Sequence, residues 1–159
     1  MNSFKKLKNL RTLLVDDDEL IRDALSIAFR KHGCFLLPVE TAEEGLQALA
    51  GERFDIIISD FRLPGMDGLE FLKQSAALQP DTMNVLITAY RDQKLSSESA
   101  RIVVHEIVEK PYALGELITA LVALANTRGV VKPAAAAPTR STDRNHKKIK
   151  FDNEEIHHE

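Results

Sequence analysis

The sequence has a single cysteine, Cys34, and this scarcity excludes two kinds of stabilised small domain. One cysteine cannot form a disulfide within the chain, nor can it supply the thiolates of a cysteine-based zinc cluster. Because the residues after Cys34 are apolar and free cysteines are commonly buried, we interpret it as a structural thiol.

Long apolar runs are also missing. The apolar segments are far shorter than the roughly 20 residues of a membrane span, and the N-terminal stretch MNSFKKLKNL lacks the apolar core of a signal peptide. We therefore expect a cytoplasmic protein that does not contact the membrane. A length of 159 residues with 44% hydrophobic and 28% charged residues suits one globular domain with some length to spare.

A strong net charge is the third absence. The chain has a formal net charge of −3, which divides into −5 over residues 1–126 (14 Lys and Arg, 19 Asp and Glu) and +2 over 127–159 (7 against 5). A mildly acidic main part disfavours nonspecific binding to nucleic acid, so we expect none by this chain.

Short apolar segments alternate with helical patterns along most of the chain. Strands are predicted at 12–15, 34–39, 56–59 and 84–87, with a fifth ending near 109, and helices at about 21–29, 41–50, 69–78, 92–99 and 114–124. Thr41 and Glu44 have the spacing of a capping box, Gly33 suits a helix C-terminus, and Pro38 places the second strand at a sheet edge. Strands alternating with helices predict an α/β fold, a doubly wound parallel sheet with helices on both faces.

Polar side chains follow four of these strands. Functional groups in such sheets gather at the carboxyl ends of the strands, so we expect these side chains to be neighbours: Asp16, Asp17, Asp60, Thr88 and Lys110. Clustered carboxylates repel one another, and a hard divalent cation, Mg²⁺ or Mn²⁺ by ligand type, relieves that repulsion. A carboxylate nucleophile, a metal, a hydroxyl and an ammonium together are suited to a phosphoryl group.

The motifs LLVDDDE, IIISDFRLPGMDG, LITAY and VEKP occur in this order at those strand ends. In this the chain resembles the receiver domains of bacterial two-component response regulators, the CheY-like family. The resemblance runs from about 11 to 125 and implies a flavodoxin-like strand order 2-1-3-4-5. It also implies a receiver domain over 11–126, between a basic N-terminal tail at 1–10 and a linker or tail at 127–159.

The resemblance also implies a role for each site residue. Asp60 corresponds to the phosphoacceptor, Asp16 and Asp17 to the Mg²⁺-binding pair, and the backbone carbonyl of Arg62 to a further metal ligand. Thr88 and Lys110 correspond to the pair that senses and neutralises the phosphoryl group. Such a protein is a signalling phosphoacceptor rather than an enzyme, with only self-phosphorylation and self-dephosphorylation chemistry of its own.

The family's partners follow from the same resemblance. The phosphoryl group comes from a sensor histidine kinase or a phosphotransfer protein, and phosphorylation switches a surface for a downstream effector, here about 92–124. The fourth helix, fifth strand and fifth helix of that surface also allow a dimer, and the sequence leaves monomer and dimer open.

Three positions depart from the family's pattern or adjust it. Ile107 stands where receivers usually have an aromatic residue whose rotamer is coupled to the threonine, so we leave open whether the usual switching operates. Arg62 and Tyr90 each lie two residues beyond a site residue, and we hypothesise that their side chains slow self-dephosphorylation. Two bland interpretations compete: a drifted core residue at 107, and solvent-exposed side chains at 62 and 90.

Two other functions remain as alternatives. A Mg²⁺-dependent phosphohydrolase with an aspartyl-phosphate intermediate would need a second acid where Arg62 stands, and a scaffold that is never phosphorylated would not need the acidic set. His32 and His105 lack zinc spacing and are interpreted as structural. The segment after Thr127 reads as linker, in either a stand-alone receiver or part of a larger regulator.

Overall fold

The computed structural model describes residues 3–89 and 103–136 of the chain, and side chains up to 127. The helix expected at 92–99 lies outside the described residues. Five parallel strands form one sheet in the order β2-β1-β3-β4-β5, which confirms the predicted α/β fold. The strands are β1 (Arg11–Val15), β2 (Phe35–Val39), β3 (Ile56–Asp60), β4 (Met83–Thr88) and β5 (Glu106–Glu109).

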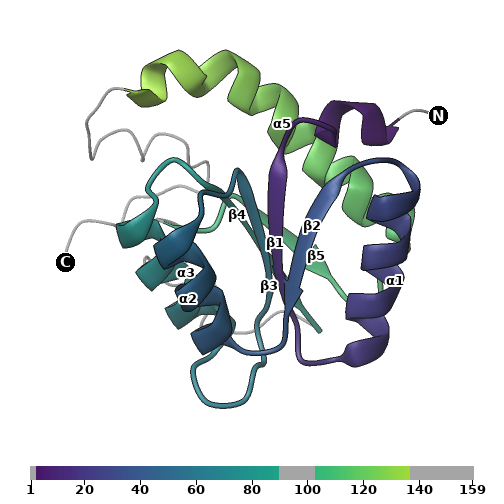
Figure 1. Cartoon of the computed structure of the whole chain (residues 1–159), viewed down its shortest axis with the longest axis vertical. Helices are drawn as coiled ribbons and strands as arrows, with labels where there is room; N and C mark the ends of the chain where they lie inside the picture. Colours follow the sequence, from purple (N-terminus) through teal and green to yellow (C-terminus); the bar gives the residue numbers. More distant parts are fainter. Residues whose placement is uncertain (1–2, 90–102, 137–159) are drawn as a thin grey trace.

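Helices cover both faces of this sheet (Figure 1). They are α1 (Glu19–Lys31), α2 (Ala42–Gly51), α3 (Gly68–Leu78) and α5 (Leu114–Ala136), and a 3₁₀ helix, η1 (Ser3–Leu7), precedes β1. Figure 1 shows α1 and α5 on one face and α2 and α3 on the other. None of the described helices is long and apolar enough to cross a membrane.

Alternate residues of the central strands feed two separate cores. Leu14, Ile58 and Ile87 pack toward α1 and α5, whereas Leu13 and Ile57 pack toward α2 and α3. Every residue of β3 is buried, as expected for a strand covered on both faces. The strand that ends in Asp60 is therefore held rigidly from both sides.

The local signals read from the sequence correspond to observed caps. Thr41 and Glu44 form the predicted capping box at the start of α2. Gly33 follows the end of α1 with a φ of 72°, a left-handed conformation that glycine adopts at little cost. The second strand, which contains Pro38, lies at the edge of the sheet beside β1.

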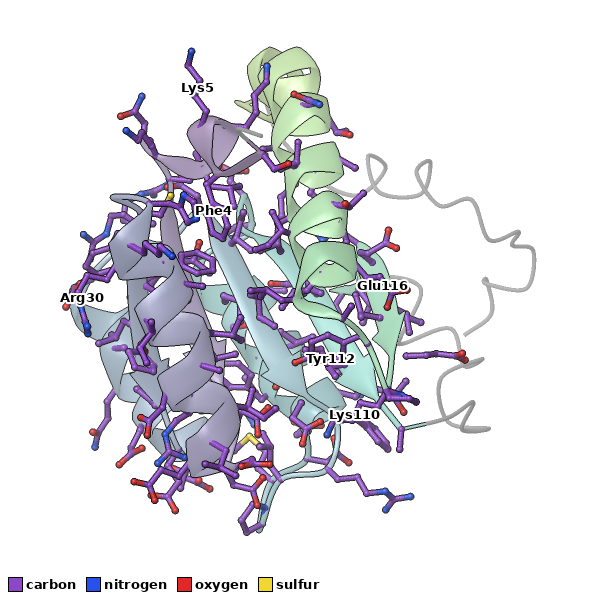
Figure 2. All side chains as sticks on the ribbon, turned by 90° about the vertical axis from the view of Figure 1, so that its right-hand side faces the viewer. Phe4, Lys5, Arg30, Lys110, Tyr112 and Glu116 are labelled. Carbon is purple, nitrogen blue, oxygen red and sulfur yellow. The ribbon has the colours of Figure 1, made fainter. Side chains whose placement is uncertain are left out.

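The N-terminal segment differs from the tail that we expected over residues 1–10. Leu7 of η1 is 1% exposed and joins the core between α1 and α5. Phe4 stacks on His32 at 4.1 Å between ring centroids and meets Phe29 edge-on at 5.6 Å (Figure 2). The prediction missed this because three lysines mask one buried residue, Leu7, and one partly buried residue, Phe4, in a short stretch. At the other end, α5 continues to Ala136, beyond the boundary expected at 126.

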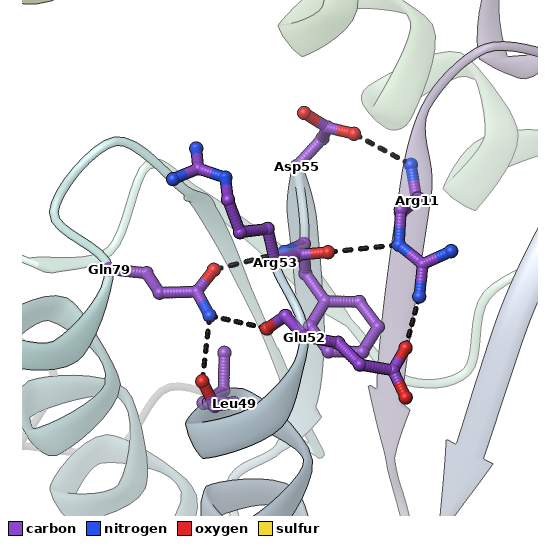
Figure 3. A network of polar contacts seen from close by, with 7 residues as sticks. Arg11, Leu49, Glu52, Arg53, Asp55 and Gln79 are labelled. Carbon is purple, nitrogen blue, oxygen red and sulfur yellow. Dashed lines mark hydrogen bonds and ion pairs between the residues drawn. The ribbon is translucent and has the colours of Figure 1, made fainter.

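A polar network closes the sheet end opposite the predicted site (Figure 3). The backbone N–H of Arg11 donates to Asp55 at 2.7 Å, and the Arg11 guanidinium donates to the carbonyl of Arg53 and pairs with Glu52. The side-chain amide of Gln79 donates to the carbonyls of Leu49 and Glu52 at 3.0 and 2.7 Å. These contacts join β1 to the loops that enter β3 and β4.

Candidate phosphoryl-transfer site

Three carboxylates meet at the carboxyl end of the sheet. Asp16 and Asp17 follow β1, and Asp60 ends β3, which is paired with β1. One oxygen from each lies within 4.8 Å of the others. Asp16 is 1% exposed and Asp60 5%, while Asp17 is exposed. The structure therefore brings together the acidic residues that the sequence analysis singled out.

Lys110 and Thr88 complete this cluster from the neighbouring strands. The Nζ of Lys110 lies 3.0 Å from Asp60 Oδ1. Thr88, 4% exposed, ends β4 directly after Ile87, the register partner of Asp60. The backbone N–H of Lys110 donates to the Thr88 carbonyl at 2.7 Å, which fixes the two residues relative to each other.

The charges of this cluster are only partly compensated. Burial raises the pKa of Asp16 to about 6, and the nearby Asp60 carboxylate adds to that rise. Burial also raises the pKa of Asp60, although the hydrogen bond and the charge of Lys110 act in the opposite direction. Like charges brought together out of water favour the protonated acids unless a cation is bound.

One buried oxygen points to that cation. Asp16 Oδ1 accepts from the backbone N–H of Asp18 at 2.9 Å, whereas Asp16 Oδ2 is buried and has no hydrogen-bond partner among the described residues. Buried carboxylate oxygens normally have a hydrogen-bond donor or a metal as partner. Because carboxylate oxygens are hard ligands, the cluster fits Mg²⁺.

The loop after Asp60 is held close to the strand by a glycine. A Cβ on Gly68 would lie 2.1 Å from the Asp60 carbonyl oxygen, so no side chain fits there. The N–H of Gly68 donates to the Phe61 carbonyl at 2.8 Å, and Asp67 caps α3 by accepting from Glu70. The close approach of Gly68 to Asp60 could not be read from the sequence motif alone.

A second residue that sequence analysis passed over is Tyr112. It lies half-buried after the Lys110–Pro111 peptide bond, which is cis, and packs against the core on the α1 and α5 face (Figure 2). Burial, together with the charges of Asp16, Asp60 and Asp18, raises its pKa to about 12. Its place directly after the lysine–proline pair was the available signal.

The structure describes the surroundings of most of the other singled-out residues. The Arg62 guanidinium is 5.7 Å from the ring centroid of Phe61, Ile107 is 36% exposed on β5, and Tyr90 lies outside the described residues. The Nδ1 of His105 accepts from the backbone N–H of Asn84 at 2.9 Å. Cys34 is buried, with its thiol 3.4 Å from the Phe4 carbonyl.

The protein-family model described as response regulator receiver domain matches residues 12–122 of this chain. This chain belongs to the receiver domain family. Its members are phosphoacceptors of two-component signalling that bind Mg²⁺ at an acidic cluster and interact with histidine kinases or phosphotransfer proteins and with effector domains. Neither the phosphohydrolase nor the scaffold is favoured.

Among curated relatives, the receiver is 30% identical over 130 residues to the transcriptional regulatory protein FixJ of Bradyrhizobium diazoefficiens. That alignment covers 82% of this chain and 62% of FixJ, so the chain spans less than two thirds of that regulator.

Solved receiver structures have the same fold. A CheY-like receiver domain from Methanospirillum hungatei superposes with a TM-score of 0.72 at 26% identity, over 76% of this chain and 97% of that one. The response regulator TrrA from Thermotoga maritima, solved in complex with Mg²⁺ and BeF, has a TM-score of 0.65 at 30% identity, over 72% of this chain and 98% of TrrA.

Proposed function

We propose that Asp60 of this receiver accepts a phosphoryl group from a phosphohistidine of a sensor kinase or phosphotransfer protein. A bond forms between phosphorus and an Asp60 carboxylate oxygen as the bond between phosphorus and the imidazole nitrogen breaks. The observation that supports this role is the contact of Lys110 Nζ with Asp60 Oδ1 at 3.0 Å, beside two further carboxylates.

The other site residues divide the remaining work. Lys110 neutralises negative charge on Asp60 and on the incoming phosphoryl oxygens, and Thr88 offers a hydroxyl donor at the adjacent strand end. Asp16, Asp17, Asp60 and the carbonyl of Arg62 are the proposed ligands of Mg²⁺, with Mn²⁺ as a substitute. When bound, the metal offsets the repulsion between carboxylates and phosphoryl oxygens.

The signalling output is a second part of the proposal. Phosphorylation adds charge and acceptor oxygens beside Thr88, and a bias between two conformations is enough to alter a binding surface. We assign that surface to about 92–124, where an effector or a second copy would bind, and we place the reaction in the cytoplasm. Nucleic-acid binding is not part of this role.

The lifetime of the phosphorylated state is expected to depend on Arg62 and Tyr90. Side chains two residues beyond Asp60 and Thr88 can cover the approach of a hydrolytic water. Replacing both residues, Arg62→Asn with Tyr90→Ala, should speed loss of the phosphoryl group. An unchanged rate would leave these side chains without a role in hydrolysis.

The effect of Ile107 on switching is tested separately, by structures with and without beryllofluoride. If residues 88–110 do not move between the two structures, conventional switching does not operate here.

Phosphorylation by a small donor tests the central proposal directly. The chain is incubated with acetyl phosphate and Mg²⁺, and the adduct is followed by intact-protein mass. Wild type should form one adduct, Asp60→Asn none, and the control Asp81→Asn, which removes an exposed carboxylate, should behave as wild type. An adduct of undiminished yield in Asp60→Asn, or none in wild type, would overturn the assignment.

A further inference from the structure

The side chain of Arg22 contacts the backbone of the loop after β1 that carries Asp16 and Asp17. Arg22 lies in the second turn of α1, is half-buried, and its Nη1 donates to the carbonyl oxygen of Asp16 at 2.9 Å. It also lines a surface hollow with Val39, Glu40 and Glu44, between α1, β2 and α2.

The carbonyl that Arg22 binds belongs to the peptide unit that joins Asp16 to Asp17. A peptide unit is planar, so fixing the direction of this carbonyl also fixes the N–H of Asp17 on the other side of the plane. The orientation of that plane also sets the position of the Asp17 Cα atom, from which the side chain extends. One hydrogen bond therefore acts on both members of the acidic pair.

The other bonds of the loop act on different atoms. The N–H of Asp16 donates to the Val39 carbonyl at 3.1 Å, and Asp16 Oδ1 accepts from Asp18 N–H. Asp18 Oδ1 in turn accepts from Leu20 N–H at 2.9 Å and caps α1. These bonds hold the strand end, the Asp16 carboxylate and the helix start, whereas the Arg22 bond holds the peptide plane between the carboxylates.

We propose that Arg22 is a positioning residue for the divalent-cation site, which it shapes without touching the cation. The inference rests on the proposed function, since it takes Asp16 and Asp17 as metal ligands. Groups that orient the ligands of a metal commonly change its affinity by about 10-fold or more when they are removed.

The sign of the effect separates positioning from charge. A guanidinium near the site repels Mg²⁺, so removing its charge alone would tighten Mg²⁺ binding. Removing a group that orients the two carboxylates would weaken it. Arg22→Met keeps an apolar stem of similar length and deletes both the charge and the donor, so the measured direction decides between the two.

Calorimetric titration of the full 159-residue chain with Mg²⁺ alone tests this inference. We expect the dissociation constant to rise about 10-fold in Arg22→Met. In Arg22→Lys, which keeps a donor and the charge, affinity should recover part of the way. The control Arg30→Met removes an exposed arginine near the other end of α1 and should leave the affinity unchanged.

Unfolding by urea in EDTA shows whether each variant folds as wild type does. If Arg22→Met is unfolded, Arg22→Gln replaces it, because glutamine is neutral and too short to keep the same bond. Unchanged or tighter Mg²⁺ binding in the folded variant would overturn the positioning role, as would an equal loss in Arg30→Met. A wild type that binds no Mg²⁺ would instead overturn the proposed function.

Discussion

The carboxyl group of Asp16 has two oxygens in very different surroundings. Oδ1 accepts from the N–H of Asp18, and Oδ2 is buried without a partner among the residues described. Burial raises the pKa of the group to about 6, above its ordinary 3.8. The folded protein therefore holds a proton on Asp16 over a pH range in which the unfolded chain releases it.

This difference gives the metal-free protein a defined pH dependence. Below about pH 4 the Asp16 carboxyl is protonated in both the folded and the unfolded state, so its burial does not lower the free energy of unfolding. Between pH 4 and 6 the free energy of unfolding falls as pH rises. Above pH 6 the full cost of burying the ionised carboxylate remains. We expect Asp16→Asn to stabilise the protein by on the order of 2 kcal/mol at pH 7.5 in EDTA and by little at pH 4.

Urea unfolding at the two pH values measures this effect. The control Asp23→Asn removes an exposed carboxylate of α1 and should change stability by less than about 0.5 kcal/mol at either pH. A gain in Asp16→Asn that is larger at pH 4 than at pH 7.5 would contradict the interpretation.

Close backbone contact makes a second residue-level prediction. Gly68→Ala would press a methyl group against the Asp60 carbonyl, so we expect a loss of about 1–3 kcal/mol and slower phosphorylation. In the matched control Gly51→Ala, the added Cβ meets no atom within 4 Å and should be neutral or slightly stabilising. Equal unfolding midpoints for the two variants would contradict the contact.

At the scale of elements, η1 joins two helices that are far apart in sequence. Phe4 contacts Phe29 and His32 of the α1 end, and Leu7 packs in the core that α5 completes. Both residues come from a stretch dominated by lysine. The segment is thus an integral part of the fold on the α1 and α5 face.

Truncating one buried side chain of η1 tests this role. We expect Leu7→Ala to lower the free energy of unfolding by about 2–5 kcal/mol, because Leu7 is 1% exposed. Lys6→Ala, a change on the same short helix at an exposed position, should stay within about 0.5 kcal/mol of wild type. Equal urea midpoints for both variants would show that η1 does not contribute to the stability of the fold.

At the scale of the whole molecule, the two ends of the sheet differ in how well their polar groups are satisfied. The end with Arg11 and Gln79 is joined by hydrogen bonds and an ion pair (Figure 3). The opposite end gathers three carboxylates, and over the described residues Lys110 pairs with Asp60 while Asp16 Oδ2 is buried without a partner.

Mg²⁺ should therefore stabilise the entire domain. A ligand that binds only the folded state adds about 2.7 kcal/mol when its concentration is 100 times the dissociation constant. We expect the thermal midpoint to rise with Mg²⁺, to fall back when EDTA removes it, and to respond less at pH 5, where Asp16 is largely protonated. An equal response in Asp17→Asn would argue against this site.

The strand ends and the acidic cluster could be predicted from the sequence because each signal is local. Apolar runs such as Ile56–Ile58 and capping pairs such as Thr41 with Glu44 act over a few residues, and topology then brings the strand ends together. Gly68, Arg22 and η1 could not be foreseen in the same way. Gly68 and Arg22 meet the backbone of Asp60 and Asp16 because of how the intervening loops turn, which residue types alone do not show. Leu7 packs against distant elements, and three lysines hid it.

The edges of the sheet carry a consequence for self-association. Val39 O accepts from Asp16 N–H on the β1 side, and since backbone groups alternate along a strand, the ring nitrogen of Pro38 faces outward. That edge lacks a donor where another strand would pair, and the opposite edge strand, β5, begins and ends with exposed glutamates, Glu106 and Glu109. Proline and charge at edges discourage strand addition, so the folded chain resists growing into an intermolecular sheet.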